Sequence, residues 1–197
     1  MIETATTTCS IALLDGDRVV DERHETVGRG HAERLIPMIR DLLGTSVPDA
    51  VLVDCGPGSF TGIRVGLAAA RALGLAWGVP VHGFSSLGLI AAGAADDLGA
   101  AVAITGGHGE LFVQCFAGTP PRATGALASL TPAAAAAAIA DDRVLGSGAS
   151  ALVAARGHGR AVEAAPRAAD LVRMHQDDTL LPPRPIYGRA PDAALPA

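Results

Sequence analysis

The residues best placed to do chemistry lie in a glycine-rich loop between a short apolar segment and a long one. The loop consists of Gly56, Pro57, Gly58, Ser59, Phe60, Thr61 and Gly62. A loop between a strand and a helix can hold an anion on free backbone N–H groups. A P-loop would require Gly-Lys-Ser/Thr, and all 15 basic residues of this chain are arginines. The P-loop interpretation is therefore excluded.

Two other enzyme interpretations of this loop have little support. A dinucleotide fold requires Gly-x-Gly-x-x-Gly and an acidic residue after the next strand. Here the third glycine is displaced to Gly62, and the next strand ends in Gly83-Phe84-Ser85. A nucleophile at Ser59 or Cys55 would need a base, and the sequence fixes none nearby. The structural interpretation is a tight turn in which Ser59 or Thr61 caps a helix, Phe60 packs and Cys55 is buried. No catalytic residue is predicted.

The sequence predicts no transition-metal site. The six histidines show no i, i+4 pair, and the three cysteines are widely spaced without a C-x-x-C pair. This cysteine usage is typical of a reduced, intracellular protein. Glu3 could coordinate a nucleotide-bound magnesium ion, but one carboxylate does not define such a site.

Composition narrows the classes of function. The net charge of −5 argues against a stand-alone nucleic-acid binder. Hydrophobic residues make up 49% and charged residues 18%, which excludes global disorder. Charges and prolines interrupt every apolar stretch before it reaches membrane-spanning length, and no signal peptide is visible. We expect a cytoplasmic protein without a membrane partner.

Strand and helix patterns alternate in the first half of the chain. Strands are predicted at 2–4, 9–14, 18–25, 50–53 and 79–84, the first of them short, and helices at 33–43, 62–77 and 85–95. The second half repeats this order more faintly, with strands at 101–105, 110–117, 143–145 and 160–164. Helices are predicted after Thr131-Pro132, at 148–156 and at 168–175. We predict two α/β lobes, 1–97 and 98–197, each with a mixed sheet flanked by helices.

A longer string around the loop is far more specific than its glycines. The residues from Gly56 to Leu67 read Gly-Pro-Gly-Ser-Phe-Thr-Gly-Ile-Arg-Val-Gly-Leu. This string resembles the signature of the TsaB family, also called YeaZ, of tRNA threonylcarbamoyladenosine biosynthesis proteins. Further matches are Ile2-Glu3-Thr4-Ala5-Thr6, the segment from His31 to Ile39, Gly83-Phe84-Ser85-Ser86-Leu87, and Pro185-Ile186-Tyr187 with Arg189 and Pro191-Asp192-Ala193. The family's Asp-Ala-Arg turn is replaced by Thr105-Gly106-Gly107-His108 before Glu110, which leaves the function of that turn open.

The resemblance implies a fold and a role. The fold would be two ribonuclease-H-like lobes of the actin/sugar-kinase/Hsp70-like (ASKHA) architecture around a cleft. The role would be that of a non-catalytic dimerisation subunit that binds and activates the catalytic paralogue TsaD, for threonylcarbamoylation of the adenosine next to the tRNA anticodon. TsaD carries a metal-binding H-x-x-x-H on its third helix, and the corresponding positions here are Ser86 and Ile90. The implied partners are TsaD, the ATPase TsaE and a second copy of the chain, with tRNA bound only through the complex. No cofactor is implied for the isolated chain, although ATP or ADP could bind at the complex boundary.

The helix at 62–77 supports association independently of the resemblance. Only Arg64 and Arg71 are charged in it, and a helix this apolar is either central or covered by a partner. We predict that it forms a helical bundle with the helix at 33–43 and a related pair of TsaD or of a second copy. The predicted contact residues are Leu35, Met38, Ile39, Leu42, Ile63, Gly66, Leu67, Ala70, Leu73 and Gly74.

Three other functions remain as alternatives. One is a nucleotide-binding ATPase or kinase-like enzyme that uses the cleft. Another is a peptidase, which the absent histidine pair disfavours. The last is a direct tRNA-binding module, which the acidic balance disfavours.

Overall fold

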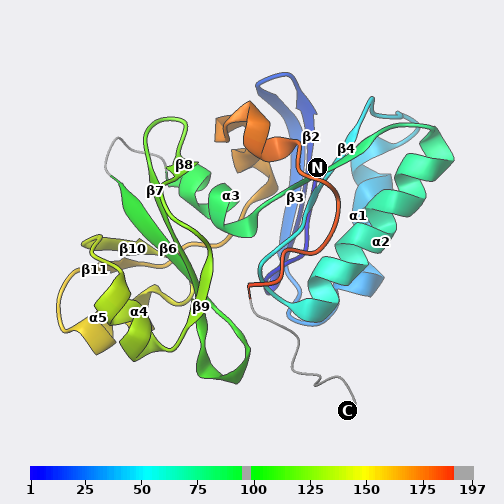
Figure 1. Cartoon of the computed structure of the whole chain (residues 1–197). Coiled ribbons are helices and arrows are strands. Elements are labelled where there is room, and N and C mark those ends of the chain that lie inside the picture. Colours follow the sequence, from blue (N-terminus) through cyan, green and yellow to red (C-terminus); the bar gives the residue numbers. More distant parts are fainter. Residues whose placement is uncertain (95–98, 189–197) are drawn as a thin grey trace, which may run out of the picture.

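The computed structural model describes residues 1–94 and 99–188, and it contains two β-sheets with helices around and between them (Figure 1). Three features predicted from the sequence lie outside these residues: the end of the third helix at Ala95, the lobe boundary at 97/98, and the tail matches from Arg189 onward. Within the described residues, no helix is both long enough and apolar enough to cross a lipid bilayer.

The first sheet has the strand order β3-β2-β1-β4-β5. Its strands are β1 (Ile2–Glu3), β2 (Thr8–Asp15), β3 (Arg18–Thr26), β4 (Val51–Asp54) and β5 (Val81–Phe84). Strands β1 to β3 are antiparallel, whereas β4 and β5 run parallel to β1. The accompanying helices are α1 (His31–Leu43), α2 (Phe60–Trp77) and α3 (Ser86–Gly93). The predicted mixed sheet is confirmed, and β1 is short as expected.

The second sheet repeats this topology. Its strands are β6 (Ala100–Thr105), β7 (Leu111–Ala117), β8 (Arg122–Ala123), β9 (Ala128–Leu130), β10 (Arg143–Leu145) and β11 (Arg160–Val162). The order is β11-β10-β6-β7-β8, and β9 also pairs with β7. As in the first sheet, the first strand of the sheet, here β6, lies between an antiparallel second strand, β7, and a parallel later strand, β10. The helices are α4 (Pro132–Ala138), α5 (Ala149–Arg156) and the short 3₁₀ turn η1 (Gly107–Gly109).

The helices form layers on both sides of each sheet (Figure 1). Helices α1 and α2 pack on the outer face of the first sheet, and α4 and α5 pack on the outer face of the second. Helix α3 lies between the sheets: Leu89 packs with Phe84 of β5, whereas Leu87 packs with Val102 of β6. This position explains why every residue of α3 except Gly93 is buried.

The segment after β11, part of the span predicted as second lobe and tail, returns to the first sheet. The predicted helix at 168–175 is instead two 3₁₀ helices, η2 (Ala168–Arg173) and η3 (Gln176–Thr179). The amide of Ala168 donates to Ser10 Oγ at 2.9 Å, and Leu181 pairs with Gly83 on β5. These bonds place residues 168–188, the return segment, on the first lobe. Its few apolar residues gave no periodic signal of this.

Candidate functional site

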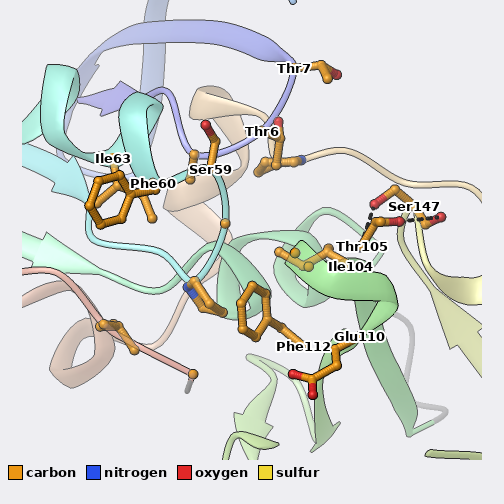
Figure 2. Close-up of a pocket in the computed structure, with 18 of the residues that line it drawn as sticks. Thr6, Thr7, Ser59, Phe60, Ile63, Ile104, Thr105, Glu110, Phe112 and Ser147 are labelled. Carbon is orange, nitrogen blue, oxygen red and sulfur yellow. Dashed lines mark hydrogen bonds between the residues drawn. The ribbon is translucent and has the colours of Figure 1, made fainter. Parts of the chain in front are cut away.

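A cleft of about 1180 Å³ lies between the two lobes. One wall consists of the turn at 5–7, the glycine loop and the start of α2; the other consists of residues 104–112 and Ser147. Figure 2 shows Thr6, Thr7 and Ser59 facing the space from one wall, and Thr105 and Ser147 facing it from the other. The end of the return segment, residues 185–188, closes one side. The cleft implied by the resemblance is therefore present.

The glycine loop is held by backbone contacts with the first strand. Gly56 adopts a φ of 95°, and its amide donates to Asp54 Oδ1 at 2.6 Å. The amide of Ser59 donates to the carbonyl of Ala5 at 2.7 Å, and a Cβ on Gly58 would collide with that same carbonyl. The loop thus needs glycine because its backbone touches the backbone of the turn after β1.

The Ser59 hydroxyl serves as a helix cap and the Cys55 thiol is buried, so neither group is set up as a nucleophile. Ser59 caps α2, since its Oγ accepts a hydrogen bond from the amide of Gly62 at 3.2 Å. Cys55 is fully buried as predicted, and burial, with a smaller contribution from Asp54, raises the pKa of its thiol to about 11. A thiol of this pKa stays protonated at neutral pH and is a poor nucleophile.

The loop after β10 in the second lobe has the same construction. A Cβ on Gly146 would collide with the carbonyl of Ala103 on β6, and the amide of Gly148 donates to that carbonyl at 2.9 Å. Between the two glycines, Ser147 Oγ accepts from the amide of Thr105 at 3.1 Å. The sequence analysis missed this loop. Its signal is a Gly-Ser-Gly triplet directly after a short apolar strand.

Aromatic and charged side chains line the cleft unevenly. Half of the chain's six aromatic residues lie here, namely Phe60, Phe112 and Tyr187. The prediction that Phe60 packs into the protein is wrong, because it is 59% exposed and the guanidinium of Arg64 stacks 3.3 Å from its ring centroid. Arginines line the first wall, whereas the carboxylate of Glu110, which accepts from Ser129 Oγ at 2.7 Å, lies on the second.

Two buried carboxyl groups lie at neighbouring strand ends beside the cleft. Glu3 of β1 and Asp54 of β4 are both fully buried, and they follow the paired residues Ile2 and Val53. Burial, reinforced by the charge of Asp54, raises the pKa of Glu3 well above its ordinary value, and burial raises the pKa of Asp54 to about 7. The sequence analysis missed Asp54, since a single Asp at a strand end carries no pattern.

The residues considered above for metal binding, Glu3 and the positions Ser86 and Ile90, lie in different environments. Glu3 Oε1 accepts from the amide of Ala5 at 2.7 Å and Oε2 from Thr8 Oγ1 at 3.0 Å, so its carboxyl is not open to a magnesium ion. Ser86 donates to Asp54 Oδ1 at 2.7 Å, and Ile90 is buried in the layer between the sheets. In residues 1–94 and 99–188, no three His, Cys, Asp or Glu side chains cluster in a way that could hold a metal ion.

The predicted partner-contact residues need correction. Eight of the ten are buried in the first lobe's own core: Leu35, Met38, Ile39, Ile63, Gly66, Leu67, Ala70 and Gly74. The glycines bring α2 close to the sheet, because a Cβ on Gly66 would meet Thr4 and one on Gly74 would meet Val81. Leu42 and Leu73 are half-buried. The small residues of α2 thus serve packing within the chain.

The opposite side of α2 is open to solvent. Leu75 is 86% exposed, and the helix also exposes Arg64, Ala68, Arg71, Ala72 and Ala76. We call these six residues the outer face of α2. On α1, the neighbouring large apolar side chain is Ile36, which is 51% exposed. A partner that binds α1 and α2 would contact these exposed residues.

Comparison with known proteins gives consistent results. Residues 23–169 match the family described as TsaD, tRNA N6-adenosine threonylcarbamoyltransferase. The TsaB protein of Escherichia coli is 43% identical over 98 residues, which span 47% of this chain and 42% of that protein. TsaB of Bacillus subtilis is 34% identical over 96 residues, again 42% of its length. These matches thus span less than half of the curated relatives.

A solved structure extends the similarity to almost the whole chain. The structure of YeaZ from Pseudomonas aeruginosa superposes with a TM-score of 0.78 at 29% identity, and covers 94% of this chain and 97% of that one. The ASKHA-type fold and the TsaB/YeaZ resemblance inferred from the sequence are confirmed. Because the family model covers most of its length, the chain belongs to the threonylcarbamoyltransferase (TsaD) family, within which it is similar to the TsaB/YeaZ proteins.

Proposed function

We propose that this chain is a non-catalytic subunit in the biosynthesis of threonylcarbamoyladenosine on tRNA, and that it binds and activates a catalytic TsaD subunit. The observation that carries the proposal is the outer face of α2 in a chain of this family. The TsaB proteins it resembles are named for this biosynthesis. TsaE and a second copy of the chain are further partners under this proposal, and tRNA is reached through the complex.

The outer face of α2 has the features of a helix-packing surface. Leu75 would lose most of its large exposed area on contact with a partner, and burial of a leucine stabilises an interface by about 1.5–3 kcal/mol. Beside it, Ala68 and Ala72 leave space for a second helix to approach. Arg64 and Arg71 add positive charge along the same side, which favours a partner helix with carboxylates.

The decisive experiment is reconstitution of tRNA modification with TsaD and TsaE, with and without this chain. We expect threonylcarbamoyladenosine to form only when the chain is added. The variant Leu75→Asp should weaken binding to TsaD at least tenfold and lower modification in parallel, with an unchanged melting temperature. Ala154→Glu, at an exposed position of α5, is the matched control and should behave as wild type. Full modification without the chain would refute the proposal.

A second candidate function is binding of a nucleotide such as ATP or ADP in the cleft or at a subunit boundary. The observation that favours it is the stacked pair of Phe60 and Arg64 at the N-terminus of α2, with Arg29 on the same wall. Aromatic rings and guanidinium planes stack on bases, and helix N-termini favour phosphates. Calorimetry with ADP should detect binding that Arg64→Ala removes. Phosphate release by the isolated chain would support the enzyme alternative instead.

A further inference from the structure

The feature that the proposed function does not use is the buried pair of Glu3 and Asp54. The two carboxyls lie on adjacent parallel strands, one residue beyond the register pair of Ile2 and Val53. Adjacent strands are about 4.8 Å apart, so side chains at neighbouring positions share one face of the sheet. That face meets α3 and η2, since Ser86 of α3 donates to Asp54 and Ala168 of η2 donates to Ser10, the register partner of Glu3. Both carboxyl groups are fully buried.

Among residues 1–94 and 99–188, no cationic side chain forms a hydrogen bond or ion pair with these two carboxyl groups. The hydrogen bonds to Glu3 come from Ala5 and Thr8, and those to Asp54 come from Gly56 and Ser86. All four donors are neutral. Other titratable groups near the pair are the Cys9 and Cys55 thiols, both of raised pKa, and His82, which pairs in register with Leu52 and not with Asp54. The charged residues of η2 are engaged elsewhere, since Asp170 pairs with Arg173.

The two oxygens of Asp54 have different surroundings. Oδ1 accepts from the amide of Gly56 in the glycine loop and from the hydroxyl of Ser86 at the start of α3. Oδ2 is buried and has no hydrogen-bond partner among the described residues. A buried, unpaired, charged oxygen is far costlier than a neutral hydroxyl. Oδ2 is therefore the favoured position for a proton.

We propose that Asp54 and Glu3 form a buried proton-binding site, and that the proton held there keeps the glycine loop attached to α3. With the proton bound, Oδ1 links Gly56 to Ser86 and fixes the loop from which α2 begins. When the proton leaves Asp54, a negative charge remains in the dry layer without a hydrogen-bond partner at Oδ2. The cost of that buried charge then favours movement of Asp54 toward water in the cleft, which takes the loop away from α3. This device is independent of the partner proposed above.

The proposal is tested by the ¹³Cγ chemical shift of Asp54 in the full-length chain, labelled at aspartate and assigned with Asp54→Asn. We expect a titration midpoint above pH 6, against about 3.9 for an unperturbed aspartate. Ser86→Ala should move the midpoint higher, because it removes a donor to the charged form. An Asp54 that is fully ionised at pH 5 would overturn the proposal.

Hydrogen exchange tests the link to the loop. In the wild type, the exchange rate of the amides of residues 58–61, corrected for the intrinsic rate, should be at least tenfold higher at pH 9 than at pH 6. The neutral Asp54→Asn variant should show no such increase. If loop protection in the wild type stays constant through the carboxyl titration, the proposed attachment is wrong. Both wild-type measurements stand even if the variant fails to fold.

Discussion

The two lobes share one strand order, but different kinds of side chain are buried in them. Fully or nearly buried polar side chains of the described residues all belong to the first lobe or to the return segment: Glu3, Thr4, Thr8, Ser10, His31, Asp54, Ser86 and Thr179. The second sheet is packed by short, alanine-rich α4 and α5. Strand pairing thus preserves the topology in both lobes. Buried polar side chains, which find hydrogen-bond partners except at Asp54 Oδ2, are confined to the first lobe and the return segment among the described residues.

The loops that face the cleft show what both lobes retain. Gly58 lies against the carbonyl of Ala5 in the first lobe, and Gly146 lies against that of Ala103 in the second. The loop after β4 touches the turn that follows β1, and the loop after β10 touches β6 itself. Only the first loop leads into an 18-residue helix with an exposed apolar side. The two loops therefore share their backbone geometry, whereas the exposed apolar side of α2 is a feature of the first lobe.

The largest expected effect concerns a buried charge in the first lobe. Ala70 is fully buried on α2, so Ala70→Glu places a carboxylate in the core and should destabilise the fold by more than about 4 kcal/mol. Ala154→Glu on exposed α5 should change stability by less than about 0.5 kcal/mol. Thermal unfolding followed by circular dichroism measures the stability of both variants. A folded Ala70→Glu protein would show that α2 does not pack as described.

The two cleft loops provide the next comparison. Gly58→Ala and Gly146→Ala each force a methyl group into a backbone carbonyl, and we expect a loss of about 1–3 kcal/mol or more in both. Urea unfolding measures the two losses side by side. Gly125→Ala, at a position with open space around Cβ, is the control and should be nearly neutral. A large loss in only one lobe would show that the two loops are not equivalent.

Stability should fall with pH in a way that depends on the first lobe alone. The pKa of Asp54 is about 7 when folded and 3.8 when unfolded, so the folded state binds more protons between these values. The contribution is therefore fully present below pH 3.8 and is lost as the pH rises to about 7. At 1.36 kcal/mol per unit, we expect a loss of about 2–4 kcal/mol. Urea titrations at pH 4.5 and 7.5, with Asp54→Asn as the comparison, measure it. A loss of the same size in that variant would assign the effect to other groups.

The smallest effect concerns the ion pair that ties Arg167, the residue just before the return segment, to β3. Arg167 makes two hydrogen bonds to Glu22, at 2.6 and 2.5 Å. Because Arg167 is half-exposed, Arg167→Ala should cost only about 0.5–1 kcal/mol. Arg18→Ala removes a largely exposed pair with Asp15 and should have no measurable effect. Equal thermal shifts for the two variants would show that the return segment is not held by this pair.

Local pattern was enough to predict most of the first lobe. The strands predicted at 9–14 and 18–25 are β2 and β3, and the helix predicted at 33–43 ends at the same residue as α1. In the second lobe, β8 and β9 were missed because neither contains a buried residue, so no apolar pattern marks them. The packing of the return segment on the first lobe was not predicted, since its hydrogen bonds to that lobe are made by backbone groups at Ala168 and Leu181, which leave no trace in side-chain pattern.

The candidate site was predicted in part. The glycine loop and its cap at Ser59 follow from residue types with fixed local geometry. The loop around Ser147 and the carboxyl of Asp54 were missed, because their importance depends on neighbours more than 30 residues away in the chain. The exposed stacking of Phe60 was likewise not readable, since an aromatic residue after a turn can face either way.

The sequence by itself determined which segments are strands and helices, where the glycine loop lies, and to which family the chain is similar. These features depend on short-range spacing, and local spacing is what a sequence records. Only the tertiary structure decided which side of α2 is free, where the return segment lies, and that Glu3 and Asp54 share a dry layer. An apolar, small-residue helix can present either side to its own sheet, and the sheet position of β1 and β4 selects one of them.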